Sequence, residues 1–210
     1  MMQFTRMVTL RGPERETMAW AAEITAEVSA KTGLDVTCWT SAFGRPVGTL
    51  IWSTMVESHD QLFTALSKTR GDPAYAATVA KATAWLVTPA EDALRSFVSM
   101  HGEAPTSAVG SVAFATRTVI ANGKLAEAMA WADEVAEYAS QLTGLSIALM
   151  SDVYGMFGAI SWLGVLPNMA AVDSMQAVTM ADAGYMQRMI DAGDLFVPTM
   201  SARALAVRIA

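Results

Sequence analysis

The chain repeats itself at an interval of 110 to 111 residues, and this repeat limits the folds open to it more than any other feature. The tetrapeptide Met-Ala-Trp-Ala occurs at 18–21 and again at 129–132, an offset of 111. After a one-residue slip the offset becomes 110, and the matched pairs are Gly48 and Gly158, Trp52 and Trp162, Asp72 and Asp182, and Tyr75 and Tyr185. So many matches in one order predict a duplicated unit.

Each copy has the same predicted order of elements, β-α-β-β-α-β. In the first copy, strand-like runs without a breaker occupy 2–11, 34–43, 47–56 and 94–100. Helical spacing covers 14–32, and a second helix from residue 59 is interrupted at 71–73 before it resumes at 74–86. This is the ferredoxin-like order. We therefore expect an α+β chain with a first repeat at 1–102, a linker at 103–110 and a second repeat at 111–210.

A sheet covered by helices on one face leaves its other face bare, and an apolar bare face must be covered. The third predicted element of each copy has one aliphatic face, which consists of Leu34, Val36 and Cys38 in the first copy and of Leu145, Ile147 and Leu149 in the second. We expect these faces to pack on the helices. The mixed faces, which carry Trp39, Met150 and Asp152, should line a cavity between the two sheets.

In this arrangement the chain resembles the dimeric α/β-barrel superfamily in its fused tandem-repeat form. The resemblance covers almost the whole chain and rests on the topology and on a loose motif, Trp-Ser-Thr-Met-Val-Glu-Ser at 52–58, where a strand ends just before the second helix. It implies that the two repeats form one intramolecular α/β barrel. The superfamily includes cofactor-free oxygenases of polyketide quinols, polyketide cyclases, haem-degrading enzymes, chlorite-dismutase-like haem proteins and stress-response proteins. Fold alone therefore does not fix the function.

Composition and motifs argue against several classes of function. The net charge is −6 without a cluster of Lys or Arg, which argues against a nucleic-acid partner. The most apolar stretch, 157–172, is interrupted by Gly, Ser, Pro and Asn, so we expect no membrane span. One cysteine, Cys38, and no visible secretory signal favour a cytoplasmic location. No metal-ligand or nucleotide-binding motif is present, and we expect no metal and no cofactor.

Histidine is scarce. His59 lies at the entry to the second helix and His101 follows the last strand of the first copy, whereas the second copy has none. His59 could be a general base at the mouth of the cavity, or it could simply face solvent at the start of a helix. Haem ligation by His59 or His101 is a weaker alternative, because the chlorite-dismutase-like group carries its haem ligand in the second copy.

Arginine and tryptophan recur in the strands of both copies. Arg6 and Arg117 match at an offset of 111, in the middle of the first strands. On a cavity face they would form a symmetric pair that holds an anionic or enolate oxygen; otherwise they point outward. Trp52 and Trp162 are either core residues or the flat wall of a pocket for an aromatic ligand.

Two functions fit this sequence. The first is binding, with or without transformation, of a small apolar or aromatic molecule, such as a polyketide-like phenol or quinol, by a cofactor-free monooxygenase or cyclase. Its candidate catalytic residues are His59, Arg6 and Arg117, and its candidate ligand-binding residues are Trp39, Trp52, Trp162, Met150 and Asp152. The second is a protein without catalysis, either a ligand carrier or a module that assembles into homo-oligomers.

Overall fold

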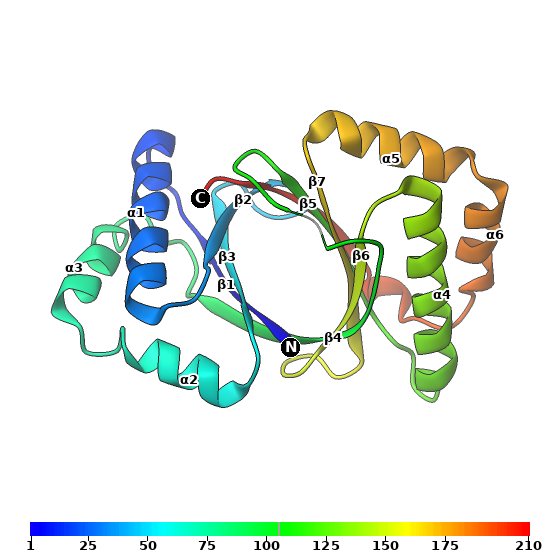
Figure 1. Cartoon of the computed structure of the whole chain (residues 1–210), viewed down its shortest axis with the longest axis horizontal. Helices are drawn as coiled ribbons and strands as arrows, with labels where there is room; N and C mark the ends of the chain where they lie inside the picture. Colours follow the sequence, from blue (N-terminus) through cyan, green and yellow to red (C-terminus); the bar gives the residue numbers. More distant parts are fainter. Residues whose placement is uncertain (105) are drawn as a thin grey trace. The chain divides into compact units, whose positions relative to one another are not determined.

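The computed structural model describes residues 1–104 and 106–210, so Pro105, in the expected linker 103–110, lies outside the described residues. The described part contains eight strands and six α-helices, in an order that runs twice through β-α-β-β-α-α-β (Figure 1). Hydrogen bonds join the strands in the closed order β1-β3-β2-β8-β5-β7-β6-β4, an eight-stranded barrel. The expected α+β class is therefore confirmed.

The elements of the two halves correspond one to one. The first half consists of β1 (Met2–Thr9), α1 (Glu14–Thr32), β2 (Thr37–Phe43), β3 (Thr49–Val56), α2 (His59–Ser67), α3 (Pro73–Lys81) and β4 (Glu91–His101). The second half consists of β5 (Val112–Val119), α4 (Leu125–Thr143), β6 (Ile147–Asp152), β7 (Ala159–Leu166), α5 (Met169–Ala181), α6 (Ala183–Asp191), the short 3₁₀-helix η1 (Pro198–Met200) and β8 (Ala202–Arg208).

The chain divides into two compact units, and the division falls within β4 and within β8. Unit 1 consists of Met1–Leu94 with Ala206–Ala210, and unit 2 consists of Arg95–Leu205. In unit 2, β4 pairs with β6 in antiparallel register from Arg95 to His101. In unit 1, the C-terminal residues bond to β2, since the amide of Ile209 donates to the carbonyl of Cys38 at 2.8 Å. Each unit therefore needs residues that are distant in sequence to complete its sheet.

The core of unit 1 lies between its strands and α1. Trp20 and Ile24 of α1 pack against Cys38 and Leu50 of the sheet, and the rings of Trp20 and Trp52 meet edge to face with centroids 5.7 Å apart. Cys38 is fully buried on this side, which confirms the expectation that the aliphatic face of its strand packs on helices. Burial also raises the pKa of the Cys38 thiol to about 12, so the thiol is protonated and inert at neutral pH.

The core of unit 2 repeats this plan with smaller helix residues. Three alanines of α4, at positions 128, 132 and 136, let the helix lie close to Ile147 and Leu149 of β6. The Trp131 and Trp162 rings meet edge to face at 6.0 Å, as their counterparts do in unit 1. No described helix is long and apolar enough to cross a bilayer.

Candidate functional site

Unit 1 contains a pocket of about 230 Å³ between its sheet and its helices. Its floor consists of alternate residues of β1 and β3, among them Phe4, Arg6, Trp52 and Thr54, which share a face because side chains alternate along a strand. The walls come from α1, α2 and α3. Most of the lining is apolar, which suits a small hydrophobic ligand. We call this site the unit 1 pocket.

Two indole rings form the aromatic part of the unit 1 pocket. Both indole N–H groups are bound to the protein: Nε1 of Trp20 donates to the carbonyl of Thr78 at 2.8 Å, and Nε1 of Trp52 donates to the hydroxyl of Thr25 at 2.9 Å. Their polar atoms are therefore committed elsewhere. What they offer to a ligand is aromatic surface of fixed orientation.

Arg6 supplies the charge in the unit 1 pocket. Its guanidinium donates two hydrogen bonds to the carboxylate of Asp92, at 2.8 and 2.7 Å. This bond is the largest cause that raises the pKa of Arg6, and Tyr75, which also lines the pocket, adds a smaller contribution. The pair is partly exposed to solvent. Arg6 is thus a fixed cation whose position a carboxylate determines.

Thr54 is a polar residue of the pocket that sequence reasoning missed. Its side chain is buried, with 5% exposed, and its hydroxyl has no hydrogen-bond partner within the described chain. A buried hydroxyl without a partner costs stability unless water or a ligand satisfies it. The only sequence signal is that Thr54 lies two residues after Trp52, on the same face of β3.

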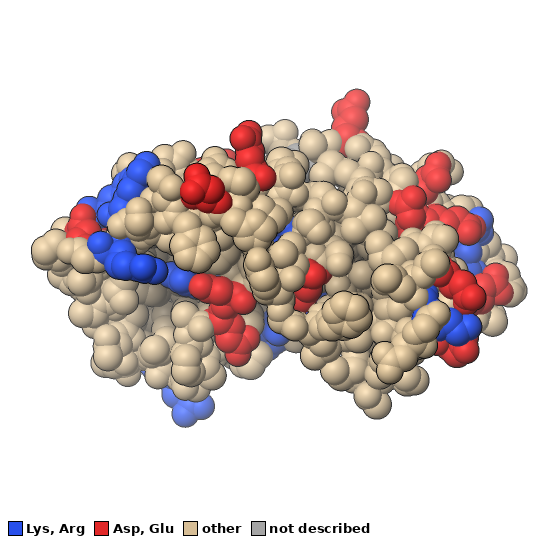
Figure 2. All heavy atoms as spheres, turned by 90° about the horizontal axis from the view of Figure 1, so that it is seen from below, with Lys and Arg blue, Asp and Glu red and all other residues tan. Residues whose placement is uncertain are grey.

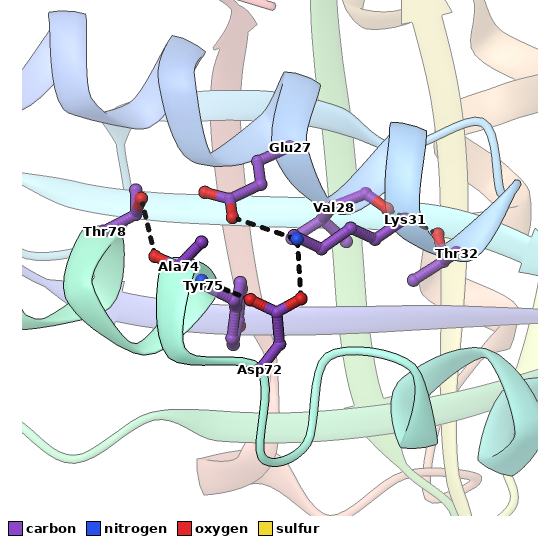
Figure 3. A network of polar contacts seen from close by, with 8 residues as sticks. All are labelled: Glu27, Val28, Lys31, Thr32, Asp72, Ala74, Tyr75 and Thr78. Atoms are coloured by element: carbon purple, nitrogen blue, oxygen red, sulfur yellow. Dashed lines mark hydrogen bonds and ion pairs between the residues drawn. The ribbon is translucent and has the colours of Figure 1, made fainter.

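An ionic network fixes α3 over the unit 1 pocket (Figure 3). Lys31 of α1 lies 2.7 Å from the carboxylate of Asp72 and 3.7 Å from that of Glu27. Asp72 also accepts the backbone N–H of Tyr75 at 2.9 Å and so caps α3. The bond from Lys31, followed by that from the Tyr75 amide, holds the pKa of Asp72 below its usual value. These contacts hold the first turn of α3, which contains Tyr75, next to α1.

The second predicted arginine occupies a different position. Arg6 pairs with Trp52 in the β1–β3 register, whereas Trp162 pairs with Thr116 and Arg117 pairs with Ser161. A shift of one residue turns a side chain to the other face of its sheet. Arg117 therefore lies on the face opposite Trp162, and the expectation that Arg6 and Arg117 form a symmetric pair is wrong.

Arg117 belongs instead to a charged cluster on β4, β5 and β6. Asp152 accepts a hydrogen bond from Nη2 of Arg117 at 2.7 Å and another from Nε of Arg95 at 3.2 Å. The Asp152 side chain is only 5% exposed. One buried carboxylate thus bonds to two guanidinium groups that come from different strands.

The remaining predicted residues do not line the unit 1 pocket. His59 is the exposed first residue of α2, which Ser58 caps. Trp39 is buried, with Nε1 donating to Thr37, and Met150 is buried on the face of β6 opposite Leu149. Trp162 lies in the helix-facing core of unit 2. Of the eight predicted site residues, the unit 1 pocket brings together Arg6 and Trp52.

His101, the alternative candidate for a haem ligand, is hydrogen-bonded to a side chain of unit 2. Its Nε2 lies 2.8 Å from the carboxylate of Asp133 on α4, and Ser99 donates to the same carboxylate. The bond from Ser99, and next that from His101, lowers the pKa of Asp133. Within residues 1–104 and 106–210, no three His, Cys, Asp or Glu side chains gather as metal ligands would.

A second hollow, of about 580 Å³, lies in unit 2 and has a different character. Connecting segments bound it, with Asn122, Phe157 and Pro198 in its wall, and Phe157 is almost fully exposed. On the surface seen in Figure 2, charged side chains are scattered in small groups of both signs, without a continuous basic area. The unit 1 pocket lies between strands and helices and is mostly apolar, so it is a better candidate for a specific small-molecule site than this second hollow.

Comparison with known proteins shows which solved structures share the fold of this chain. No family model and no curated protein sequence matches the chain. Among solved structures, a Fusobacterium nucleatum protein provisionally assigned as a monooxygenase superposes with a TM-score of 0.75 at 9% identity, over 100% of this chain and 92% of that one. An anthrone oxidase-like protein gives 0.68 at 11% identity, over 98% and 91%.

A monooxygenase-like protein from Listeria innocua gives a TM-score of 0.53 at 10% identity, over 98% of this chain and 93% of that one. A chlorite dismutase variant from Candidatus Nitrospira defluvii gives 0.54 at 9% identity, over 99% and 92%. The chain thus has a fold seen in monooxygenase-like proteins and in a chlorite dismutase. At these identities the likeness shows the fold alone.

Proposed function

We propose that the protein binds a small, flat, largely apolar molecule in the unit 1 pocket, and that it acts on this molecule as a monooxygenase-like enzyme or a cyclase without a cofactor. The observation that carries the proposal is a mostly apolar pocket that combines two fixed indole rings with one fixed guanidinium group. The site thus differs in place from the intersheet cavity expected from the sequence. The names of the structural neighbours agree with this class of function.

The chemistry follows from Arg6. A phenol next to a cation ionises more readily, because the cation favours the charged form. A phenolate is the electron-rich form that a cofactor-free oxygenase presents to dioxygen, and an enolate held in the same way would serve a cyclase. Apolar walls around the ion strengthen its attraction to Arg6, because they exclude water.

The proposal also includes an origin for the two units. Two halves with the same order of elements and matched tryptophans favour the duplication of one ferredoxin-like repeat, with repeats at 1–102 and 111–210. A cytoplasmic location, a polyketide-like ligand and assembly into homo-oligomers remain expectations from the sequence.

The first test is a thermal-shift screen with naphthols, hydroquinones and aromatic acids. A ligand that binds only the folded chain raises the melting temperature, by an amount that grows with ligand concentration. We expect naphthols to raise it in the natural chain and to raise it less in Arg6→Ala. The matched control is Arg70→Ala, which removes an exposed arginine outside the pocket and should leave the shift unchanged.

Oxygen uptake separates the two functions. A compound that binds and is consumed together with dioxygen identifies an oxygenase, whereas binding without turnover identifies a carrier, the alternative function. A screen in which no aromatic compound raises the melting temperature would contradict the proposal.

A further inference from the structure

The two units differ at the point where unit 1 has its pocket. The isolated bridge between Leu10 and Leu86 in unit 1 corresponds to the bridge between Ile120 and Phe196 in unit 2, both at an offset of 110. Leu86 and Phe196 are therefore equivalent positions. Leu86 lines the unit 1 pocket and is 46% exposed.

In unit 2 a phenyl ring occupies this position. The centroid of the Phe196 ring lies 5.3 Å from that of Trp131 and 6.2 Å from that of Trp162. These two tryptophans match Trp20 and Trp52, which line the unit 1 pocket. Phe196 thus adds an aromatic ring beside these two tryptophans, at a position where unit 1 has the aliphatic Leu86.

A second difference lies on the neighbouring strand. Thr54 of β3 matches Gly164 of β7, and each pairs with a phenylalanine, Phe4 and Phe114 respectively. A Cβ atom at position 164 would lie 2.2 Å from the ring of Phe114, so the glycine makes room for that ring. Phe114 packs against the core of unit 2. In unit 1 a threonine, Thr54, stands at the position of this glycine, and its hydroxyl has no hydrogen-bond partner within the described residues.

We infer that unit 1 holds the single aromatic-ligand site within residues 1–104 and 106–210. The ring of its ligand lies where Phe196 lies in unit 2, and the Thr54 hydroxyl bonds to a hydroxyl or carbonyl group of that ligand. In unit 2, Phe114 and Phe196 pack against the core at the corresponding positions, and Phe196 also lines the second hollow. The inference rests on the proposed function, and it adds the class of ligand, a phenol of one or two rings, and the residues that select it.

The size of the pocket supports this class. A cavity of about 150 Å³ holds one benzene molecule in a well-studied case, and the unit 1 pocket measures about 230 Å³. A second ring therefore fits as well. Residues two apart on a strand, such as Trp52 and Thr54, are separated by roughly 6.6 Å. A two-ring phenol that packs on the Trp52 ring and bonds to the Thr54 hydroxyl must span this distance.

The test uses 1-naphthol and naphthalene, titrated by calorimetry or by quenching of tryptophan fluorescence. We expect one 1-naphthol per natural chain. In Thr54→Val, affinity for 1-naphthol should fall roughly two- to tenfold, which corresponds to one neutral hydrogen bond. Affinity for naphthalene should not change, because naphthalene has no oxygen.

Leu86→Phe provides an independent test, because it places in unit 1 the ring that unit 2 already has. We expect at least about a tenfold loss of 1-naphthol affinity without a loss of melting temperature, since an aromatic side chain replaces the ligand against the two indoles. Leu125→Phe, at an exposed leucine outside the unit 1 pocket, is the matched control and should bind as the natural chain does. Phe196→Leu should open unit 2 and raise the stoichiometry towards two.

The outcomes separate this inference from the proposed function. Unchanged 1-naphthol binding in both Leu86→Phe and Thr54→Val, or two molecules bound per natural chain, would overturn the inference while the proposed function stands. If neither probe nor any other aromatic compound binds the natural chain, the proposed function fails first.

Discussion

Asp152 shows how much a single side chain can contribute to this fold. Its buried carboxylate accepts hydrogen bonds from Arg95 and Arg117, which come from two different strands. Removal of one partner from a buried ion pair leaves the other charges uncompensated, and this costs about 3–5 kcal/mol in typical cases.

We therefore expect Asp152→Asn to lower the free energy of unfolding by about 3 kcal/mol, because both guanidinium groups would lose the carboxylate charge to which they bond. Urea denaturation at neutral pH measures the change. Asp191→Asn is the control, because that carboxylate is exposed and bonds to a neutral amide, that of Gln187. Equal effects of the two substitutions would show that the cluster does not stabilise the fold.

Gly48 is a second residue whose effect can be isolated. A Cβ atom there would lie 2.1 Å from the carbonyl oxygen of Leu10, and its φ is +82°. Gly71 has a similar φ of +79° but open space around it. Both Gly→Ala substitutions should destabilise through the backbone, and Gly48→Ala should cost at least about 1 kcal/mol more. Comparison of the two urea midpoints measures the clash alone, and equal midpoints would contradict the close approach.

At the scale of residues, the sequence predicts local features better than register. The sequence predicts that Trp52 is either a core residue or part of a pocket wall, and in the structure it packs on the core and lines the pocket. The match of Arg6 with Arg117 at an offset of 111 does not hold in the strands, because the connections before the long helices differ in length. The connection has four residues in unit 1, 10–13, and five in unit 2, 120–124. The first strands therefore match at an offset of 110 and the helices at 111. Thr54 could not be found, because the absence of a partner for its hydroxyl is a property of the folded core.

Among the elements, α3 and α6 are two helices whose stability we expect to depend on pH. Asp72 and Asp182 accept the backbone N–H groups of Tyr75 and Tyr185 and cap the two helices. The pKa of each carboxyl is lowered, for Asp72 first by Lys31 and for Asp182 first by the Tyr185 amide. A lowered pKa stabilises the fold fully above the ordinary Asp pKa, about 3.9. This stabilisation is lost as the pH falls through the lowered folded-state value.

Asp72→Asn should therefore lower the melting temperature at pH 6, and the difference from the natural chain should shrink as the pH falls through the lowered pKa of Asp72. Melting curves from pH 6 to pH 2 test this expectation. The control is Asp173→Asn, at an exposed position of α5, which should show no such dependence. A constant difference between natural chain and Asp72→Asn over the whole range would show that ionisation of Asp72 is irrelevant.

The sequence predicted most elements because their signals are local. α1 runs over Glu14–Thr32 as expected, with Gly33 in the left-handed conformation that ends many helices. The break in the second helix at 71–73 is also correct. The expected helix at 74–86 instead ends at Lys81, because residues 85–87 bond to the end of β1, with Val87 N–H donating to the carbonyl of Thr9 at 2.8 Å. That partner is distant in sequence, and local patterns carry no sign of it.

For the molecule as a whole, the sequence carries no sign that the compact units divide within β4 and β8. Unit 1 joins residues 206–210 to the first 94 residues. Removal of Ile209 and Ala210 should uncover the β2 backbone at Cys38, to which both residues bond.

We expect this truncation to accelerate labelling of Cys38, the single cysteine, by a thiol reagent, because a buried thiol reacts only when the structure opens locally. Ile209→Ala keeps the backbone hydrogen bonds and is the matched control, so it should change the labelling rate much less. Equal rates in the truncated and natural chains would show that the C-terminal residues do not protect β2.

The placement of residues 206–210 also has a consequence for biosynthesis. Domains commonly fold in the order in which the ribosome makes them, at roughly 5–20 residues per second. Here the sheet of unit 1 is complete only after residues 206–210 have left the exit tunnel. Until then the nascent chain keeps an unfinished strand edge, the stage at which a chaperone would be of most use to it.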